Sequence, residues 1–165
     1  MKLKKHEILN YITYGLYVIS SLDKGCVIDT VCQVTSSKED EPIITFVINK
    51  DSETAKTINK TKQAYVSVLN TKTSLDTIAL FGYNHSNKVK KFDYVVCNNV
   101  LGHHILTENT VGYMKCKVKE IIELGDRYLY IAKVEFRTTL KPKSKPLTYN
   151  RYKLRLKVAK LLKRK

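Results

Sequence analysis

The chain has 165 residues, of which 43% are hydrophobic and 27% are charged. This composition is typical of a soluble globular protein and predicts one domain spanning residues 1–165. Thirty Lys and Arg against fifteen Asp and Glu give a formal net charge of +15, and residues 136–165 hold twelve of the basic residues and no acid. The basic C-terminal segment suits contact with nucleic acid, an anionic membrane or an acidic protein, and it equally suits a solvated surface.

Cysteine spacing and hydropathy exclude several classes of protein. The four cysteines form no C-x-x-C pair and no zinc-finger pattern with histidine, so we expect reduced thiols and no metal site. The N-terminal MKLKKHEILNYITYG lacks the apolar stretch of a signal peptide, and no run of about 18 apolar residues predicts a membrane span. These patterns predict a cytoplasmic protein without a membrane partner.

The first half of the chain alternates between strand and helix signals. Residues 14–21 (YGLYVISS) are rich in aromatic and β-branched residues, and residues 42–50 (PIITFVINK) give the strongest strand pattern. Ser52 is placed to cap a helix. In chain order we predict a helix over 5–12, a strand over 14–21, a turn over 23–25, a strand with a polar loop over 26–37, a strand over 42–50, a helix over 54–61 and a strand over 64–69.

The second half begins with a capping serine, Ser74, followed by helical spacing of apolar residues. Gly125-Asp126 is a hairpin signal between two long strand-like runs. Residues 151–165 fit both a strand, by alternation, and a helix face. In chain order we predict a helix over 74–81, a polar loop over 82–91, paired strands over 112–124 and 127–137, and a proline-punctuated loop over 141–146.

These elements predict a mainly β fold of about six strands with two or three short helices. Mostly antiparallel strands at this spacing favour a closed barrel, which also hides the sheet edges. The sequence contains no G-x-G-x-x-G, P-loop, G-x-S-x-G or H-E-x-x-H motif, so no catalytic side chain can be assigned from a motif.

Two other features carry weak functional signals. His103 and His104 are adjacent, but neighbours on a strand point to opposite faces, which argues against a shared metal ion. Lysine and tyrosine alternate around residues 145–153, a pattern that suits stacking on nucleic acid. Without an RNP-type or helix-turn-helix motif, nucleic acid is not the expected partner.

Polar residues gather in four short segments where strands end in loops: 30–36 (TVCQVTS), 48–54 (INKDSET), 81–92 (FGYNHSNKVKKF) and 146–152 (PLTYNRY). Small polar side chains and backbone amides in such loops match the edges of a flat ring system such as that of flavin mononucleotide (FMN). Thr54 at a predicted helix start, with Lys50 nearby, fits a phosphate. Each segment alone also fits plain turns and solvated strand ends.

The same segments resemble a known family in order and spacing. TVCQVTS, INK followed by Thr54, GDRYLYIAKV at 125–134 and PLTYNRY are similar to motifs of the flavin-reductase-like proteins of the FMN-binding split-barrel fold. The flavoredoxin-type proteins and the flavin domain of high-molecular-weight rubredoxins are the most similar group. The resemblance implies a six-stranded antiparallel Greek-key split β-barrel with a few short helices.

The resemblance also implies a homodimer with FMN near the subunit interface, and electron transfer from NADH or NADPH through FMN to a small acceptor. Thr30, Gln33, Val34, Thr35 and Ser36 would line the isoalloxazine and ribityl chain. The residues expected near the ribityl phosphate, with two further candidates, are Asn49, Lys50, Thr54, Ser86 and Lys91.

Departures from the family pattern keep alternatives open. Asp29 stands where an asparagine is usual, and its carboxylate would repel a phosphate but not a flavin ring edge. Arg127 replaces a histidine of the hairpin motif where a second substrate would approach, so a nicotinamide site is less well preserved than the FMN site. One alternative is a flavoredoxin-like electron carrier without its own NAD(P)H activity, whose basic tail attracts an acidic redox protein. Others are a basic nucleic-acid-binding module and a flavin-binding shell used only for interaction.

Overall fold

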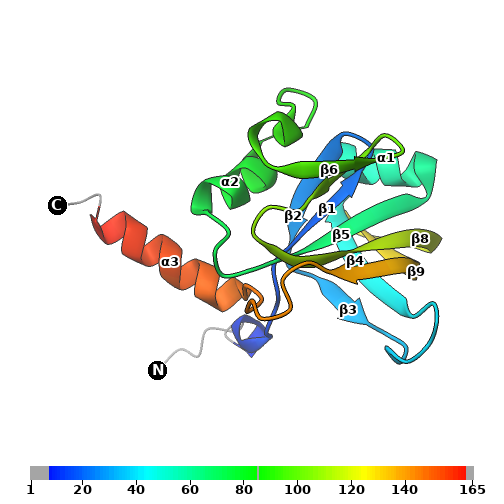
Figure 1. Ribbon diagram of the computed structural model, residues 1–165, viewed down its shortest axis with the longest axis horizontal. Helices are drawn as coiled ribbons and strands as arrows, with labels where there is room; N and C mark the ends of the chain where they lie inside the picture. The colour runs from blue at the N-terminus through cyan, green and yellow to red at the C-terminus, as the bar shows by residue number, and fades with distance from the viewer. Residues whose placement is uncertain (1–7, 85, 163–165) are drawn as a thin grey trace.

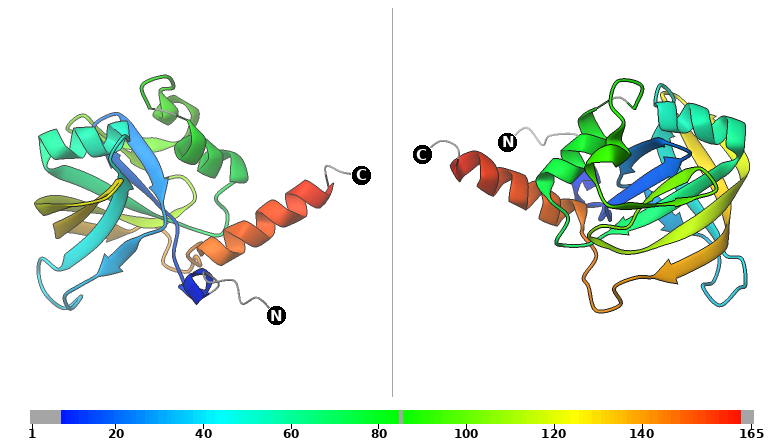
Figure 2. Two further views of the ribbon diagram at one scale, coloured as in Figure 1. Left: turned by 180° about the vertical axis from the view of Figure 1, so that it is seen from behind. Right: turned by 45° about the horizontal axis from the view of Figure 1, so that its top comes forward.

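The computed structural model describes residues 8–84 and 86–162. Within them, seven strands form one antiparallel sheet in the order β2-β1-β5-β8-β9-β4-β3, and β6 pairs with β7 in a separate hairpin. Figure 2 shows the sheet curled into a half-barrel. The mainly β, antiparallel barrel class is therefore confirmed, although the strands number seven plus a hairpin instead of six. The strands are β1 Tyr17–Ser21, β2 Lys24–Ile28, β3 Val31–Gln33, β4 Ile43–Asn49, β5 Gln63–Leu69, β6 Cys97–Val100, β7 His103–Leu106, β8 Thr110–Leu124 and β9 Arg127–Thr139.

Three α-helices accompany the half-barrel, and two short 3-10 helices, η1 and η2, complete the described elements. In Figure 1, α1 covers one end of the sheet, α2 lies beside β2, and α3 projects from the opposite end of the molecule. No described helix combines the length and the apolar run that crossing a membrane requires. The helices are η1 Ile8–Tyr11, α1 Glu53–Thr61, α2 Leu75–Tyr83, η2 Lys91–Tyr94 and α3 Tyr149–Leu162.

The predicted strand over 42–50 forms because its alternation matches a half-buried sheet. In β4, Ile44, Phe46 and Ile48 are buried and face the barrel interior. The Phe46 ring stacks on Tyr130 of β9 with centroids 4.9 Å apart, and the Tyr130 hydroxyl donates to Asn59 Oδ1 at 2.9 Å. This pairing fixes α1 against the sheet beneath it.

Both predicted helix starts are confirmed. The Ser52 hydroxyl accepts a hydrogen bond from the Thr54 N–H at 3.2 Å, and Ser74 accepts one from the Thr77 N–H at 2.9 Å. These caps satisfy backbone donors that have no partner in the first turn. The structure therefore begins α1 and α2 where the sequence placed them.

Two element predictions need correction, and one assignment that the sequence left open is settled. The strand expected from residue 26 onward is split into β2 and β3 at Asp29, and Gly25 lies inside β2 instead of in a turn. The β1–β2 turn is Leu22-Asp23, with Leu22 at φ +50°. The ambiguous segment from residue 151 is helical through Leu162, while residues 163–165 lie outside the described residues. Of the helix expected over 5–12, only the 3-10 helix Ile8–Tyr11 falls within them.

The hairpin β6–β7 was not predicted, and it holds the β1–β2 turn in place. The His103 Nδ1 accepts the Leu22 N–H at 3.0 Å, and the His104 N–H donates to the Leu22 carbonyl at 2.9 Å. His103 packs on Tyr65 and His104 on Phe92, as opposite faces of one strand require. Across the described ranges, no three His, Cys, Asp or Glu side chains are grouped to hold a metal ion.

Stability is expected to fall as the pH drops below the ordinary histidine pKa of about 6.5, because His103 must stay neutral to accept at Nδ1. Burial, and then the nearby Lys115 charge, lower the pKa of His103. The unfolded chain therefore takes up the proton first, and stability is lost between the unfolded and the folded pKa. Urea unfolding at about pH 7.5 and about pH 5 checks this. His103→Gln keeps an acceptor without titrating, so a pH dependence as steep as that of the wild type in this variant contradicts the assignment.

Candidate flavin-binding cleft

A cleft of about 810 Å³ opens between the ends of β2 and β4, the start of α1, and the helices α2 and α3. Its volume lies in the range of pockets that hold cofactors. Segments far apart in the chain meet there. The ends of β2 and β4 lie close because β2 leads through Asp29 and Thr30 into β3, which pairs with β4, and the Val47 N–H donates to the Thr30 carbonyl at 3.3 Å.

The walls of the cleft are apolar and aromatic. Val27 and Ile28 of β2 form one side, and Phe81 of α2 and Tyr149 and Tyr152 of α3 form another. Burial, followed by the hydrogen-bonded hydroxyl of Tyr83, raises the pKa of Tyr152 to about 12, so this phenol stays protonated at neutral pH. Flat, neutral surfaces of this kind suit a planar ring system.

Polar groups lie along the rim of these walls. The Thr30 hydroxyl donates to Asp29 Oδ1 at 2.9 Å, and the Ser86 hydroxyl donates to the Gly25 carbonyl at 3.1 Å. Ser52, the cap of α1, and Asn49 also line the cleft. Hydroxyl and amide groups at this rim, with the start of α1, can match a ligand that has polar edges and an anionic end.

Charge in the cleft is mixed. The carboxylates of Asp29, Asp51 and Glu53 line it together with Lys91 and Arg127. The hydrogen bond from Lys56, at 2.8 Å, holds the pKa of Glu53 below its usual range. Arg127 at the start of β9 is 52% exposed, and its Nε lies 3.4 Å from Asp126 Oδ2.

The second cation of the cleft, Lys91, has a structural position. Its buried ammonium donates to the Gly25 carbonyl at 2.9 Å and to the Phe81 carbonyl at 3.2 Å, tying β2 to α2. Burial lowers the pKa of Lys91. Arg127, whose Nε pairs with Asp126 while its side chain stays about half exposed, is therefore the cleft-lining cation better placed than Lys91 to reach an anion.

Of the ten residues that the sequence predicted for the cofactor, the structure brings four together in the cleft. These are Thr30, Asn49, Ser86 and Lys91. Lys50 lies outside the lining, where its ammonium pairs with Glu123 and lies 5.8 Å from the Tyr128 ring centroid.

Thr54 is buried behind the cleft wall. Its Oγ1 has no hydrogen-bond partner among the described residues, and it neighbours Cys26, whose thiol has a pKa raised by burial.

The other four predicted residues lie at the end of β3 and in the segment that joins it to β4, outside the cleft lining. Gln33 Nε2 donates to the Thr35 carbonyl at 2.7 Å, and the Thr35 hydroxyl accepts the Ile43 N–H at 2.8 Å. Ser36 accepts the Lys38 N–H, and Val34 is exposed. Within one copy of the chain these residues stabilise their own turn, and their role toward a cofactor stays a prediction.

Sequence reasoning did not select several residues that line the cleft. Tyr149 and Tyr152 belong to the PLTYNRY motif, which was recognised without assigning a role to its tyrosines. Ser52 was identified only as a helix cap. Val27 and Ile28 carry no signal beyond strand propensity, since the split between β2 and β3 decides which face they present.

The protein is a small β-barrel protein with a curled antiparallel sheet. Its cleft has aromatic walls and a rim of hydroxyl groups, which suit a flat ligand with polar edges. The family model described as "Flavin reductase like domain" matches residues 9–156, and the chain belongs to that family. This confirms the resemblance noted in the sequence and makes the protein a flavin-reductase-like oxidoreductase.

Individual relatives agree with the family assignment. The chain is 30% identical over 154 residues to a ferric-chelate reductase (NAD(P)H) of Archaeoglobus fulgidus, an alignment that covers 90% of this chain and 88% of the relative. The NADH:FAD oxidoreductase of Streptomyces globisporus C-1027 superposes with a TM-score of 0.75 at 18% identity, covering 86% of this chain and 83% of the other. An FMN-binding protein of Thermus thermophilus superposes with a TM-score of 0.73 at 17% identity, covering 90% of this chain and 88% of the other. These two structures show a shared fold.

Proposed function

We propose that the cleft binds FMN and that the protein transfers electrons from NADH or NADPH through FMN to a small acceptor, with a ferric chelate as the first candidate. The observation that carries the proposal is the cleft itself, with aromatic walls, a hydroxyl rim and Arg127 at its mouth. The ferric-chelate reductase relative supports the choice of acceptor.

The lining residues fit the parts of FMN. Thr30, Asn49 and Ser86 offer hydroxyl and amide groups to the edge of the ring system. The start of α1, with Ser52, and the guanidinium of Arg127 suit the phosphate. When bound, FMN would supply the hydride-accepting and electron-donating chemistry, and the protein supplies binding and orientation. The protonated Tyr152 and the apolar β2 wall keep that side of the cleft neutral and limit water.

The test is a titration of the purified chain with FMN, with FAD and riboflavin in parallel, read by quenching of flavin fluorescence. We expect saturable quenching that is tightest for FMN. Anaerobic addition of NADH and NADPH should then bleach the bound flavin, and ferric EDTA should restore the colour. Absence of quenching by any flavin overturns the proposal.

Other results distinguish the alternatives. Flavin binding without bleaching by either nicotinamide, but with fast reduction by a reduced protein carrier, identifies an electron carrier that acts with an acidic redox protein. A chain that binds no flavin but shifts an oligonucleotide in a salt-dependent way is a nucleic-acid-binding module. The homodimer and the cytoplasmic location remain part of the proposal, and sedimentation velocity tests the first.

Arg127→Glu is expected to weaken FMN binding about tenfold while leaving riboflavin binding nearly unchanged, because riboflavin lacks the phosphate. Fluorescence titration with both flavins measures this. Lys133→Glu is the matched control, since Lys133 is also a cation on β9 but pairs with Glu41 and lies outside the cleft lining. Equal losses for both flavins, or equal losses in both variants, would show that Arg127 does not contact the phosphate.

A further inference from the structure

The C-terminal helix α3 carries apolar residues on two opposite faces. Tyr149, Tyr152 and Leu156 follow one another at helical spacing and pack into the cluster beneath α2. Arg155 Nη1 donates to the Thr73 carbonyl at 2.8 Å, which fixes the helix against the β5–α2 segment. The first half of α3 is therefore attached to the half-barrel, although the helix projects beyond it (Figure 1).

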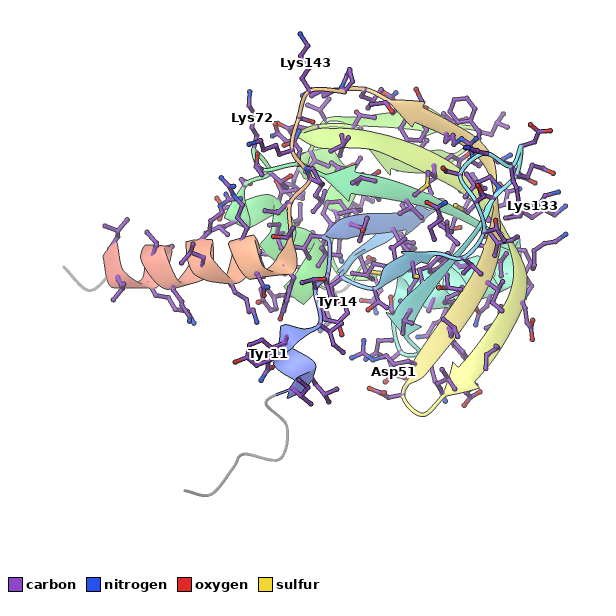
Figure 3. All side chains as sticks on the ribbon, turned by 90° about the horizontal axis from the view of Figure 1, so that it is seen from below. Tyr11, Tyr14, Asp51, Lys72, Lys133 and Lys143 are labelled. Carbon is purple, nitrogen blue, oxygen red and sulfur yellow. The ribbon has the colours of Figure 1, made fainter. Side chains whose placement is uncertain are left out.

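The other face of α3 has no covering element among the described residues. Leu154, Val158 and Leu162 are 62%, 48% and 69% exposed and lie along one side of the helix. Together with Thr71 and Leu75 they line a groove of about 1000 Å³. Figure 3 shows this helix extending clear of the sheet, beside the segment that contains Tyr11 and Tyr14. Three exposed apolar side chains in one groove indicate a surface that a partner covers.

Charge decides which partner fits. α3 holds five Lys and Arg and no acid, and two of them, Arg151 and Arg155, line the groove. A second copy of the same helix would bring like charges together around the apolar stripe, which disfavours self-pairing. A segment with acidic residues flanking apolar ones would complement both the positive charge and the apolar stripe of α3. The concave groove suits an inserted segment of protein better than a planar membrane surface.

We propose that the groove of α3 is the docking site for an acidic, amphipathic segment of a partner protein. The partner then lies beside the cleft, because Tyr149 and Tyr152 of the same helix line that cleft. The proposal does not depend on flavin binding, and it can be tested without added flavin.

The probe is a fluorescently labelled synthetic peptide of Leu, Ala and Glu, about five helical turns long, with a Gln-for-Glu peptide as its neutral counterpart. Anisotropy at about 50 mM NaCl should show binding of the acidic peptide, weakening as salt is raised, and little binding of the neutral one. Leu154→Ser should weaken binding about tenfold. Leu124→Ser is the control, since Leu124 is 52% exposed at the end of β8 and does not line the groove. It should change binding less than about twofold.

A second pair of variants tests the charge. Arg151→Gln should weaken binding of the acidic peptide more than Lys160→Gln, because Lys160 lies outside the groove lining. Equal effects within either pair, or equal binding of the two peptides, overturn the proposal. So does self-association that Leu154→Ser abolishes in sedimentation velocity, which assigns the groove to a second copy. Binding to phosphatidylglycerol vesicles but not to the peptide overturns it in favour of a lipid surface.

Discussion

Replacing Lys91 with methionine is expected to lower the free energy of unfolding by about 2–3 kcal/mol and to weaken flavin binding with it. The buried ammonium holds the Gly25 and Phe81 carbonyls at 2.9 and 3.2 Å, so its removal leaves both with fewer donors. Charge-assisted bonds of this kind, and buried groups left unpaired, each contribute about 1–3 kcal/mol. Removing the buried charge also removes its desolvation cost, the same effect that lowers the pKa of Lys91, and this offsets part of the lost stability. Urea unfolding gives the stability change.

Lys90→Met is the control for this prediction, because Lys90 is the exposed neighbour of Lys91 and precedes η2. We expect its stability and flavin affinity to match the wild type within about 0.5 kcal/mol. A Lys91→Met protein as stable as Lys90→Met would mean that the two carbonyls do not depend on the ammonium. Lys91 would then be free to contact a ligand, as the sequence first suggested.

Local patterns were sufficient for much of the sheet. The alternation in β4, the capping serines Ser52 and Ser74, and the Gly125-Asp126 turn between β8 and β9 each act within a few residues, and each predicted the element that the structure contains. Gly125 has φ +58°, the left-handed conformation that such a turn requires.

Elements that depend on distant contacts were missed or misplaced. Gly25 suggested a turn, but its place is set by Phe81 and Phe92, whose rings approach so closely that an added Cβ would lie 2.9–3.0 Å from them. The β6–β7 hairpin turns at Leu101-Gly102, which lacks the usual Asn-Gly or Asp-Gly signal, and it is fastened to the β1–β2 turn by His103.

In the candidate site, too, local patterns predicted one part and distant contacts determine the rest. Motif order predicted which loops would meet, and Thr30, Asn49 and Ser86 do meet in the cleft. The direction of a long side chain depends on partners far along the chain, as Lys50 with Glu123 and Lys91 with Gly25 show. Sequence spacing contains no information about these partners. For this reason the sequence predicted Lys50 near the phosphate, whereas we propose Arg127 for that position.

The most damaging single substitution is expected at Gly112, where β8 passes close to β9. A Cβ on Gly112 would collide with the Thr138 carbonyl oxygen and lie 2.9 Å from the Thr139 Cα, both of which are backbone atoms that cannot rotate away. Gly112→Val should therefore separate the two strands at this point and lower stability by about 4 kcal/mol or more, which is a large fraction of the stability of a typical domain.

Soluble yield and urea unfolding measure the Gly112→Val effect, with Gly112→Ala as a milder step if the valine variant does not fold. Gly102→Ala is the control: it has open space around the added Cβ, so only its φ of +83° adds strain, about 1–2 kcal/mol. Similar losses at the two glycines would contradict the close approach of β8 and β9. Because the Leu140 N–H donates to the Val111 carbonyl at 2.8 Å just beyond this point, separating the strands also displaces the segment that leads to α3. Flavin binding should therefore fail in Gly112→Ala at urea concentrations where Gly102→Ala still binds.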